Sequence, residues 1–248
     1  MPTTTAAVEP VAWDPHQQIN PDTPLSALPV LGLAVSTAGL DPLAPIIGLQ
    51  TTSGADVRAS LFKPDQPLPT DGQAARSLAL SHVTEADLAH GRSWPIIRPR
   101  LVAYLELQVG AVVTHNGSYH LGVLAARHVP PPPTIDTMRL ALFLDLTARL
   151  DRLAYALQVP LADRGPSTGG ADATTPVRVW TALVPRLTQR GVKTWGDMLR
   201  LEVSRATDRP AWPDLVRAAW RRGVRRGRKA APGEGVPGRG AGSRKSAA

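Results

Sequence analysis

Residues 30–43 read VLGLAVSTAGLDPL, a short apolar run that ends in a turn rich in Gly, Asp and Pro. Two further runs, residues 46–53 and 57–62, follow it with Ser and Gly between them. Short apolar or alternating runs separated by such residues are typical of strands joined by hairpins. The stretch therefore predicts an antiparallel meander of three strands, of which residues 30–36 form the first.

Helical patterns and one more strand fill the middle of the chain. Thr84 with Asp87 has the spacing of a capping box, and apolar residues recur at helical spacing from Pro95 onward. The run at 111–113 predicts a buried strand, which a helix over 117–127 follows. The order of strands and helices favours an α/β fold.

Further helices are expected toward the C-terminus. Apolar residues recur at helical spacing over residues 136–157 without Gly or Pro, which predicts one long amphipathic helix. Pro176 and Gly191 suit the start and the end of another helix, in which Trp180 lies on the apolar face. A second capping box pairs Thr194 with Asp197, Trp195 also has a core position, and residues 213–220 predict a last short helix.

Four segments carry a resemblance to a known family. They are VLGLAVSTAGLDPL at 30–43, KPDQPLP near 66, AVVTHNGSYHLGVLA at 111–125 and GGADATTPVRVW near 175. Together they resemble the DnaQ-like 3′ to 5′ exonucleases, in which the first of these motifs has the form xDxETTGLDP and the one after the fourth strand has the form VAHNxxFDxxFL. The resemblance implies the ribonuclease H-like exonuclease fold, a mixed five-stranded sheet flanked by helices. The strand and helix order read from the pattern agrees with it.

The same resemblance locates the catalytic positions. In that family two acids lie on the first strand, one on the helix after VAHN, and one on a late helix, after a His or Tyr that acts as general base. These positions fall on Ala34, Ser36, His120, Ser167 or Thr168, and Asp172. Only Asp172 keeps the expected group, so we expect degenerate catalytic motifs.

Metal-dependent hydrolysis needs several carboxylates around two hard divalent cations. Alanine and serine supply no anionic ligand, and the imidazole of His120 prefers softer or borderline metals. We therefore expect no metal cofactor, with Mg²⁺ or Mn²⁺ required only if the chain is a divergent active nuclease. A single borderline ion between His120 and Asp172 is the remaining metal alternative.

The positive charge is concentrated at one end of the chain. Nine basic residues and one acid lie in residues 221–248, whereas residues 1–220 hold 19 basic and 19 acidic residues and are neutral. We call residues 221–248 the basic segment. A cluster of this kind favours nucleic acid as a partner. The residues expected to contact it are Arg217, Arg221, Arg222, Arg225, Arg226, Arg228, Lys229, His115 and Asn116. For the last two, a structural role at the end of a strand is the competing interpretation.

Composition sets the domain plan and the compartment. We expect a flexible extension at 1–27, an exonuclease-like domain at 28–190, a helical appendix at 191–222 and a disordered basic tail at 223–248. The absence of cysteine excludes disulfides and thiolate metal sites. No apolar run reaches the roughly 18 residues that a membrane span needs, so a soluble cytoplasmic protein is expected.

Three functions compete. The first is a catalytically inactive exonuclease-fold protein that binds single-stranded DNA or RNA in replication, repair or RNA processing. The second is an interaction module that docks on a polymerase or repair protein. The third is a divergent metal-dependent 3′ to 5′ exonuclease that recruits other acids, such as Asp41, Asp136 or Asp163.

Overall fold

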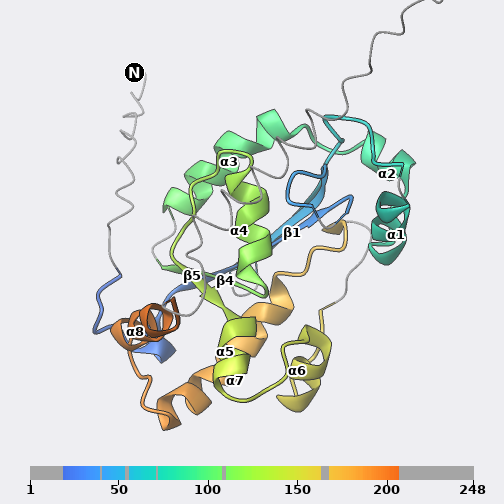
Figure 1. Cartoon of the computed structure of the whole chain (residues 1–248). Coiled ribbons are helices and arrows are strands. Elements are labelled where there is room, and N and C mark those ends of the chain that lie inside the picture. Colours follow the sequence, from blue (N-terminus) through green and yellow to red (C-terminus); the bar gives the residue numbers. More distant parts are fainter. Residues whose placement is uncertain are drawn as a thin grey trace, which may run out of the picture. The chain divides into compact units, whose positions relative to one another are not determined.

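The computed structural model describes residues 19–39, 41–53, 56–70, 72–107, 110–162 and 168–206, with side chains up to Leu201. A five-stranded sheet lies at its centre (Figure 1), with the strand order β3-β2-β1-β4-β5. The strands are β1 (Val30–Thr37), β2 (Ile46–Ser53), β3 (Asp56–Leu61), β4 (Ala111–Thr114) and β5 (Thr134–Asp136). The first three form the antiparallel meander, and β4 and β5 run parallel to β1. The mixed sheet and the meander predicted from the sequence are confirmed, with β1 in the middle.

Helices cover both faces of the sheet. They are α1 (Gln73–Leu80), α2 (Glu85–Ala89), α3 (Trp94–Leu107), α4 (Gly117–Ala125), α5 (Thr137–Phe143), α6 (Leu150–Ala156), α7 (Thr174–Gln189) and α8 (Trp195–Ala206), after a 3-10 turn at Leu25–Ala27. The capping box that begins α2 is confirmed, because the Thr84 backbone N–H donates to Asp87 and the Asp87 N–H donates back to the Thr84 hydroxyl. The box that pairs Thr194 with Asp197 is confirmed in the same way.

Strand β1 separates two hydrophobic layers because its side chains alternate between the faces. Leu31, Leu33 and Val35 pack in a core with residues of α3 and α4. The opposite layer is built from α5 to α8 and includes Trp180 and Trp195, which are 3% and 6% exposed. Both tryptophans were expected in the core, and both are there. On that second side of the sheet β1 presents small residues, and this feature positions the site described below.

The single long helix expected over 136–157 is wrong. The structure has two helices, α5 and α6, with a turn at residues 144–149 between them. Asp145 has φ 59°, a left-handed conformation that Asp tolerates better than most residues, and the Leu146 N–H donates to the Ala141 carbonyl to close α5. The apolar spacing continues across the turn because Leu140 of α5 and Leu153 of α6 are buried in the same core.

Packing extends beyond the boundaries expected for the exonuclease-like domain. Leu25 is 2% exposed, and its N–H donates to the Lys193 carbonyl in the link between α7 and α8. On the C-terminal side, Met198 of α8 lies in the same core as α7. The expected last helix at 213–220 and the basic segment lie outside the described residues. Within the described ranges, no helix combines the length and apolar character that a membrane span requires.

Candidate functional site

Ala34, at the first catalytic position implied by the resemblance, is packed against the segment that carries Asp172. Ala34 is 3% exposed and forms a small buried cluster with Ala171 and Ala173. These two alanines flank Asp172, which precedes α7. The structure therefore brings the Ala34 and Asp172 positions together, as the motif alignment requires.

Ser36 lies two residues further along β1, on the same face as Ala34. Its hydroxyl Oγ donates to the Gly169 carbonyl at 2.5 Å, and the Gly48 carbonyl of β2 is 3.5 Å away. A serine hydroxyl is neutral and has one proton to donate, which this contact uses. Ser36 thus holds the loop before α7 against the sheet.

Gln50 and Asp172 satisfy backbone donors at the start of α7. Gln50, which pairs with Ala34 across the strands, is 3% exposed, and its Oε1 accepts the Ala173 N–H at 2.5 Å. Asp172 accepts the Thr175 N–H at 2.9 Å through Oδ1. A carboxylate in this position satisfies one of the unpaired donors at a helix N-terminus. Asp172 therefore bonds the first turn of α7 from just before the helix begins.

His120 covers an open edge of β1. Strand β4 pairs with β1 only at Val30–Gly32, and beyond that point the Nδ1 of His120 lies 3.1 Å from both the N–H nitrogen and the carbonyl oxygen of Val35. Burial lowers the pKa of His120 to about 4, so the ring is neutral at physiological pH. A neutral Nδ1 either accepts the Val35 N–H or donates to its carbonyl, according to tautomer. Either bond satisfies one of the two Val35 backbone groups that β4 does not pair.

Tyr119, beside His120, ties α4 to the end of β1. Its hydroxyl is 2.6 Å from the Thr37 hydroxyl, which itself donates to the Gly39 carbonyl. Burial raises the pKa of Tyr119 above its usual value. Tyr119 falls on the aromatic position of the motif VAHNxxFDxxFL, but sequence reasoning did not single it out as a contact of the first strand.

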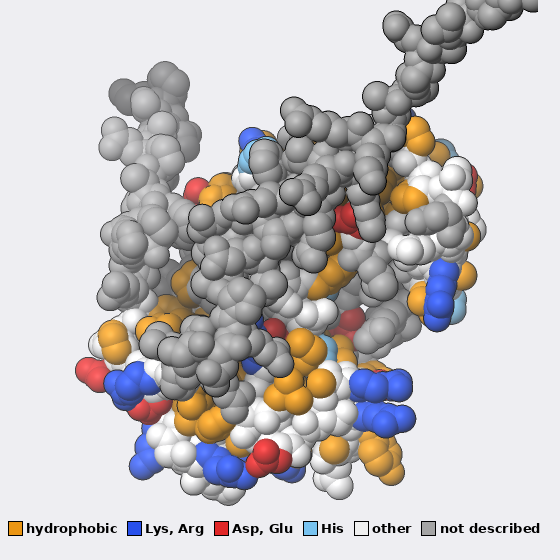
Figure 2. Space-filling view, viewed as in Figure 1, with side chains coloured by type: hydrophobic (Ala, Val, Ile, Leu, Met, Phe, Trp, Pro, Cys, Tyr) orange, Lys and Arg blue, Asp and Glu red, His pale blue; other side chains and the backbone are white. Residues whose placement is uncertain are grey.

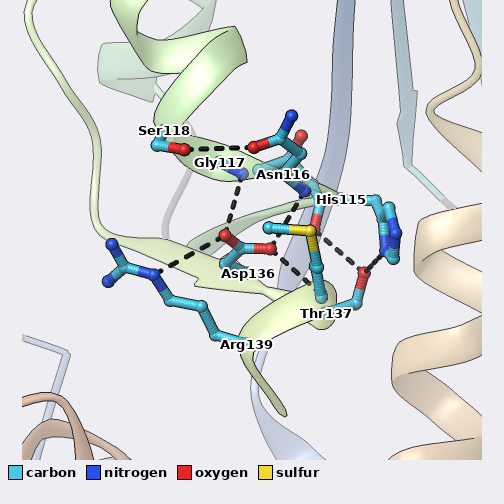
Figure 3. A network of polar contacts seen from close by, with 9 residues as sticks. His115, Asn116, Gly117, Ser118, Asp136, Thr137 and Arg139 are labelled. Atoms are coloured by element: carbon cyan, nitrogen blue, oxygen red, sulfur yellow. Dashed lines mark hydrogen bonds and ion pairs between the residues drawn. The ribbon is translucent and has the colours of Figure 1, made fainter. Parts of the chain in front are cut away.

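Asp136, a candidate for a recruited acid, is bound by backbone amides (Figure 3). Asp136 is 6% exposed, and its carboxylate accepts N–H groups from Asn116, Gly117 and Met138 at 2.9 to 3.0 Å. Arg139 adds an ion pair at 3.8 Å. Because these donors belong to the first residues of α4 and α5, the carboxylate joins two helix N-termini.

His115 and Asn116 take part in the same structure. The Nε2 of His115 donates to the Ala148 carbonyl at 2.8 Å, and Nδ1 lies 3.0 Å from the Thr137 hydroxyl. Asn116 adopts a left-handed φ of 65°, and its side-chain oxygen accepts from Ser118. These contacts tie the end of β4 to its neighbours, and a contact of either residue with nucleic acid stays a prediction.

The donor set does not fit two hard divalent cations. It offers a buried methyl group, a hydroxyl bonded to a carbonyl, an imidazole bonded to backbone and one carboxylate that accepts an N–H of the first turn of α7. Among the described residues, no three His, Asp or Glu side chains are grouped so that they could share a metal ion. Asp41 accepts the Leu43 N–H within its own turn. Ser167, Asp163 and the arginines and lysine expected to bind nucleic acid from Arg217 onward lie outside the described residues.

Comparisons with known proteins bear on the fold of the chain. No protein-family model matches the chain. The chain is 26% identical over 196 residues to a DNA polymerase III subunit epsilon-like protein of Rhodobacter capsulatus, a match that covers 72% of this chain and 27% of that one. Two structures of E. coli Exonuclease I, in complex with a dT13 and a 5cy-dT13 oligonucleotide, each superpose with a TM-score of 0.50 at 13% identity. They match 65% and 69% of this chain.

The chain spans about a quarter of the curated relative and 42% and 43% of the Exonuclease I chains. The likeness to the solved structures establishes the exonuclease fold. Together with the curated relative, it confirms the resemblance to DnaQ-like exonucleases that the motifs predicted.

Proposed function

We propose that this chain is an exonuclease-fold protein that binds nucleic acid without hydrolysing it. The observation that carries the proposal is the use of the catalytic positions for internal structure. Ala34 packs on Ala171 and Ala173, while Ser36 and His120 bond to backbone groups. Each of these positions has acquired a role in holding the fold together.

Hydrolysis of a phosphodiester by two metal ions depends on carboxylates that fix both cations and on a base for the attacking water. In this chain the strand positions supply a methyl group and a neutral hydroxyl, and the α4 position supplies a neutral imidazole. A single Asp172 carboxylate cannot neutralise two divalent cations. The proposal is therefore that the fold has kept its scaffold while losing the reaction.

Binding is assigned to the basic segment, residues 221–248. Nine basic residues among 28 can neutralise several phosphates, and phosphate contacts carry no sequence information. On the face shown in Figure 2, the Lys and Arg side chains of the described part lie in separate groups among hydrophobic and acidic ones. The neutral balance of residues 1–220 supports the same assignment.

A salt titration tests this binding. Affinity for single-stranded DNA and RNA is measured for the full chain and for residues 1–220 over a range of salt concentrations. We expect weak sequence preference and a steep salt dependence in the full chain, with a slope of about −0.7 per phosphate contacted on single strands. Truncation should lower the affinity and flatten the slope.

Equal binding by the two forms at the same salt concentration would contradict the assignment to the basic segment. If neither form bound nucleic acid, the alternative of a module that docks on a polymerase or repair protein would replace the proposal.

A further inference from the structure

We infer that the face of β1 on which the resemblance places metal ligands is closed by the chain itself, so that neither a cation nor a nucleotide enters it even when carboxylates are restored. We call this surface the closed face, formed by Gly32, Ala34 and Ser36 of β1 with Gly48 and Gln50 of β2. Residues 168–173, the docked loop, lie on it. The inference is independent of whether the basic segment binds nucleic acid.

The closed face consists mainly of small side chains in register. Ser36 pairs with Gly48, Ala34 with Gln50, and Gly32 with Thr52. Because side chains alternate along a strand, these residues share one side of the sheet. Small residues here let another segment approach the backbone of the sheet.

The docked loop makes this close approach with its own backbone. A Cβ at Gly48 would collide with the Thr168 carbonyl, and a Cβ at Gly32 would collide with the Ala173 carbonyl. From the other side, a Cβ at Gly169 would lie 2.7 Å from the Gly48 Cα, and Gly169 also has a positive φ of 59°. Both partners in the contact therefore lack side chains where they meet.

Directional bonds hold the loop in place. The Ser36 hydroxyl donates to the Gly169 carbonyl and Gln50 accepts the Ala173 N–H, one bond near each end of the loop. Ser81, which follows α1, also packs against Gly170, since a Cβ at Gly170 would collide with it. The loop thus contacts both the sheet and the turn after α1.

A carboxylate at position 34 would occupy the space that Ala171 and Ala173 fill. Those two residues are 3% and 0% exposed, so a larger side chain at 34 requires the loop to leave. A site that had only lost its acids would be open and could be rebuilt by restoring them. A closed face could not be rebuilt in this way.

Cysteine accessibility tests the closure, because the chain contains no cysteine. Ala34→Cys and Ala171→Cys place one thiol on each side of the contact, and Ala59→Cys, on the exposed strand β3, is the matched control. The rate of alkylation by iodoacetamide is measured for each variant under native conditions and in denaturant. Circular dichroism verifies the fold of each variant.

We expect the thiols at 34 and 171 to react at least about 1,000-fold more slowly than the thiol at 59 in the native state, and all three to react alike in denaturant. Native rates at 34 and 171 within about tenfold of the control would overturn the closure. If one buried variant does not fold, the other gives the result from the opposite side of the contact.

A second measurement uses the double variant Ala34→Asp with Ser36→Glu. We expect a lower melting temperature than that of the natural sequence and no rise on addition of Mn²⁺. A folded double variant whose melting temperature rises in proportion to Mn²⁺ binding would show that the face is open. Neither measurement involves nucleic acid, so failure of the closure and failure of the proposed function are separate outcomes.

Discussion

The closed face of β1 and the Asp136 network, which is Asp136 with the N–H groups of Asn116, Gly117 and Met138, are the two regions in which sequence reasoning looked for metal-binding acids. They differ in whether a carboxylate is present. In the closed face no acid remains on β1, and backbone from residues 168–173 fills the space. In the network an acid is present, but three backbone N–H groups hold its carboxylate. The comparison teaches that the residue type at one position does not decide whether a metal ion binds there. The groups that contact that residue decide it.

The difference follows from the space and the hydrogen-bond donors that each region offers to a carboxylate. The β1 positions lie against residues 168–173, whose backbone leaves no room for larger side chains. The Ala173 and Thr175 N–H donors at the start of α7 are already bonded by Gln50 and Asp172, so a new carboxylate there would compete for partners. Asp136 lies at two helix N-termini, where unpaired N–H donors and the helix dipoles favour a negative charge. We therefore expect an acid at position 34 to destabilise the fold, and the loss of the acid at position 136 to destabilise it as well.

The largest expected effect comes from transferring an acid into the closed face. Ala34→Asp should destabilise the protein by about 3 kcal/mol or more, because it buries an unpaired carboxylate and displaces the loop. Urea unfolding measures the change, with Ala59→Asp on exposed β3 as the control, for which we expect at most about 0.5 kcal/mol. Equal stability of the two variants would mean that the two regions do not differ as described.

Removing the acid from the network should have the next largest effect. Asp136→Ala leaves one buried and two partly buried N–H donors without their acceptor and should cost about 2 to 3 kcal/mol. Asp136→Asn keeps one oxygen acceptor and should lose less. Exposed Asp151, paired with Arg149, gives the control, since Asp151→Ala should change the unfolding free energy by less than about 1 kcal/mol. A loss at Asp136 no greater than this control would contradict the network's structural role.

A smaller effect is expected from His120, whose burial makes the free energy of unfolding depend on pH. Its folded pKa, about 4, lies below its usual value of 6.5 because burial disfavours the charged ring. Between these values the unfolded chain binds more protons than the folded one, so the contribution of His120 to stability is complete above pH 6.5 and is lost as the pH falls toward 4.

The measurement compares the natural sequence with His120→Gln, which removes this titration. From about pH 7 to about pH 4.5 the natural sequence should lose on the order of 2 kcal/mol more stability than the variant, measured by urea unfolding at each pH. Parallel pH profiles would show that His120 is not buried in its neutral form at the edge of β1.

The sequence predicted the central sheet and the neighbours of Ala34 better than it predicted the site. The alternating runs predicted the meander that begins with β1, because strand spacing is local. The resemblance assigned Ala34 and Asp172 to one catalytic site, and the structure brings these positions together. The closure of the site depends on contacts between Gly48 and Gly169, more than a hundred residues apart, and each glycine alone has the pattern of an ordinary turn or strand residue. Gln50, a polar residue inside an apolar strand, was the available signal for a buried partner.

The break between α5 and α6 and the role of Asp136 are two further features that residue type alone did not predict. The break between α5 and α6 escaped detection because burial on one core gives a continuous helical period whether or not the helix is continuous. Asp136 was considered as a possible metal ligand because its identity fits that chemistry. Its three amide donors come from two helices that a linear pattern does not bring together.

A nuclease assay tests most directly the central claim that the exonuclease fold persists here without the reaction. The 248-residue chain is incubated with single-stranded DNA and with short RNA in Mg²⁺ and in Mn²⁺, and release of mononucleotides is measured beside an Asp172→Ala variant prepared in the same way. The account predicts no release above background from either protein. Metal-dependent release of mononucleotides by the natural sequence, abolished in Asp172→Ala, would contradict it.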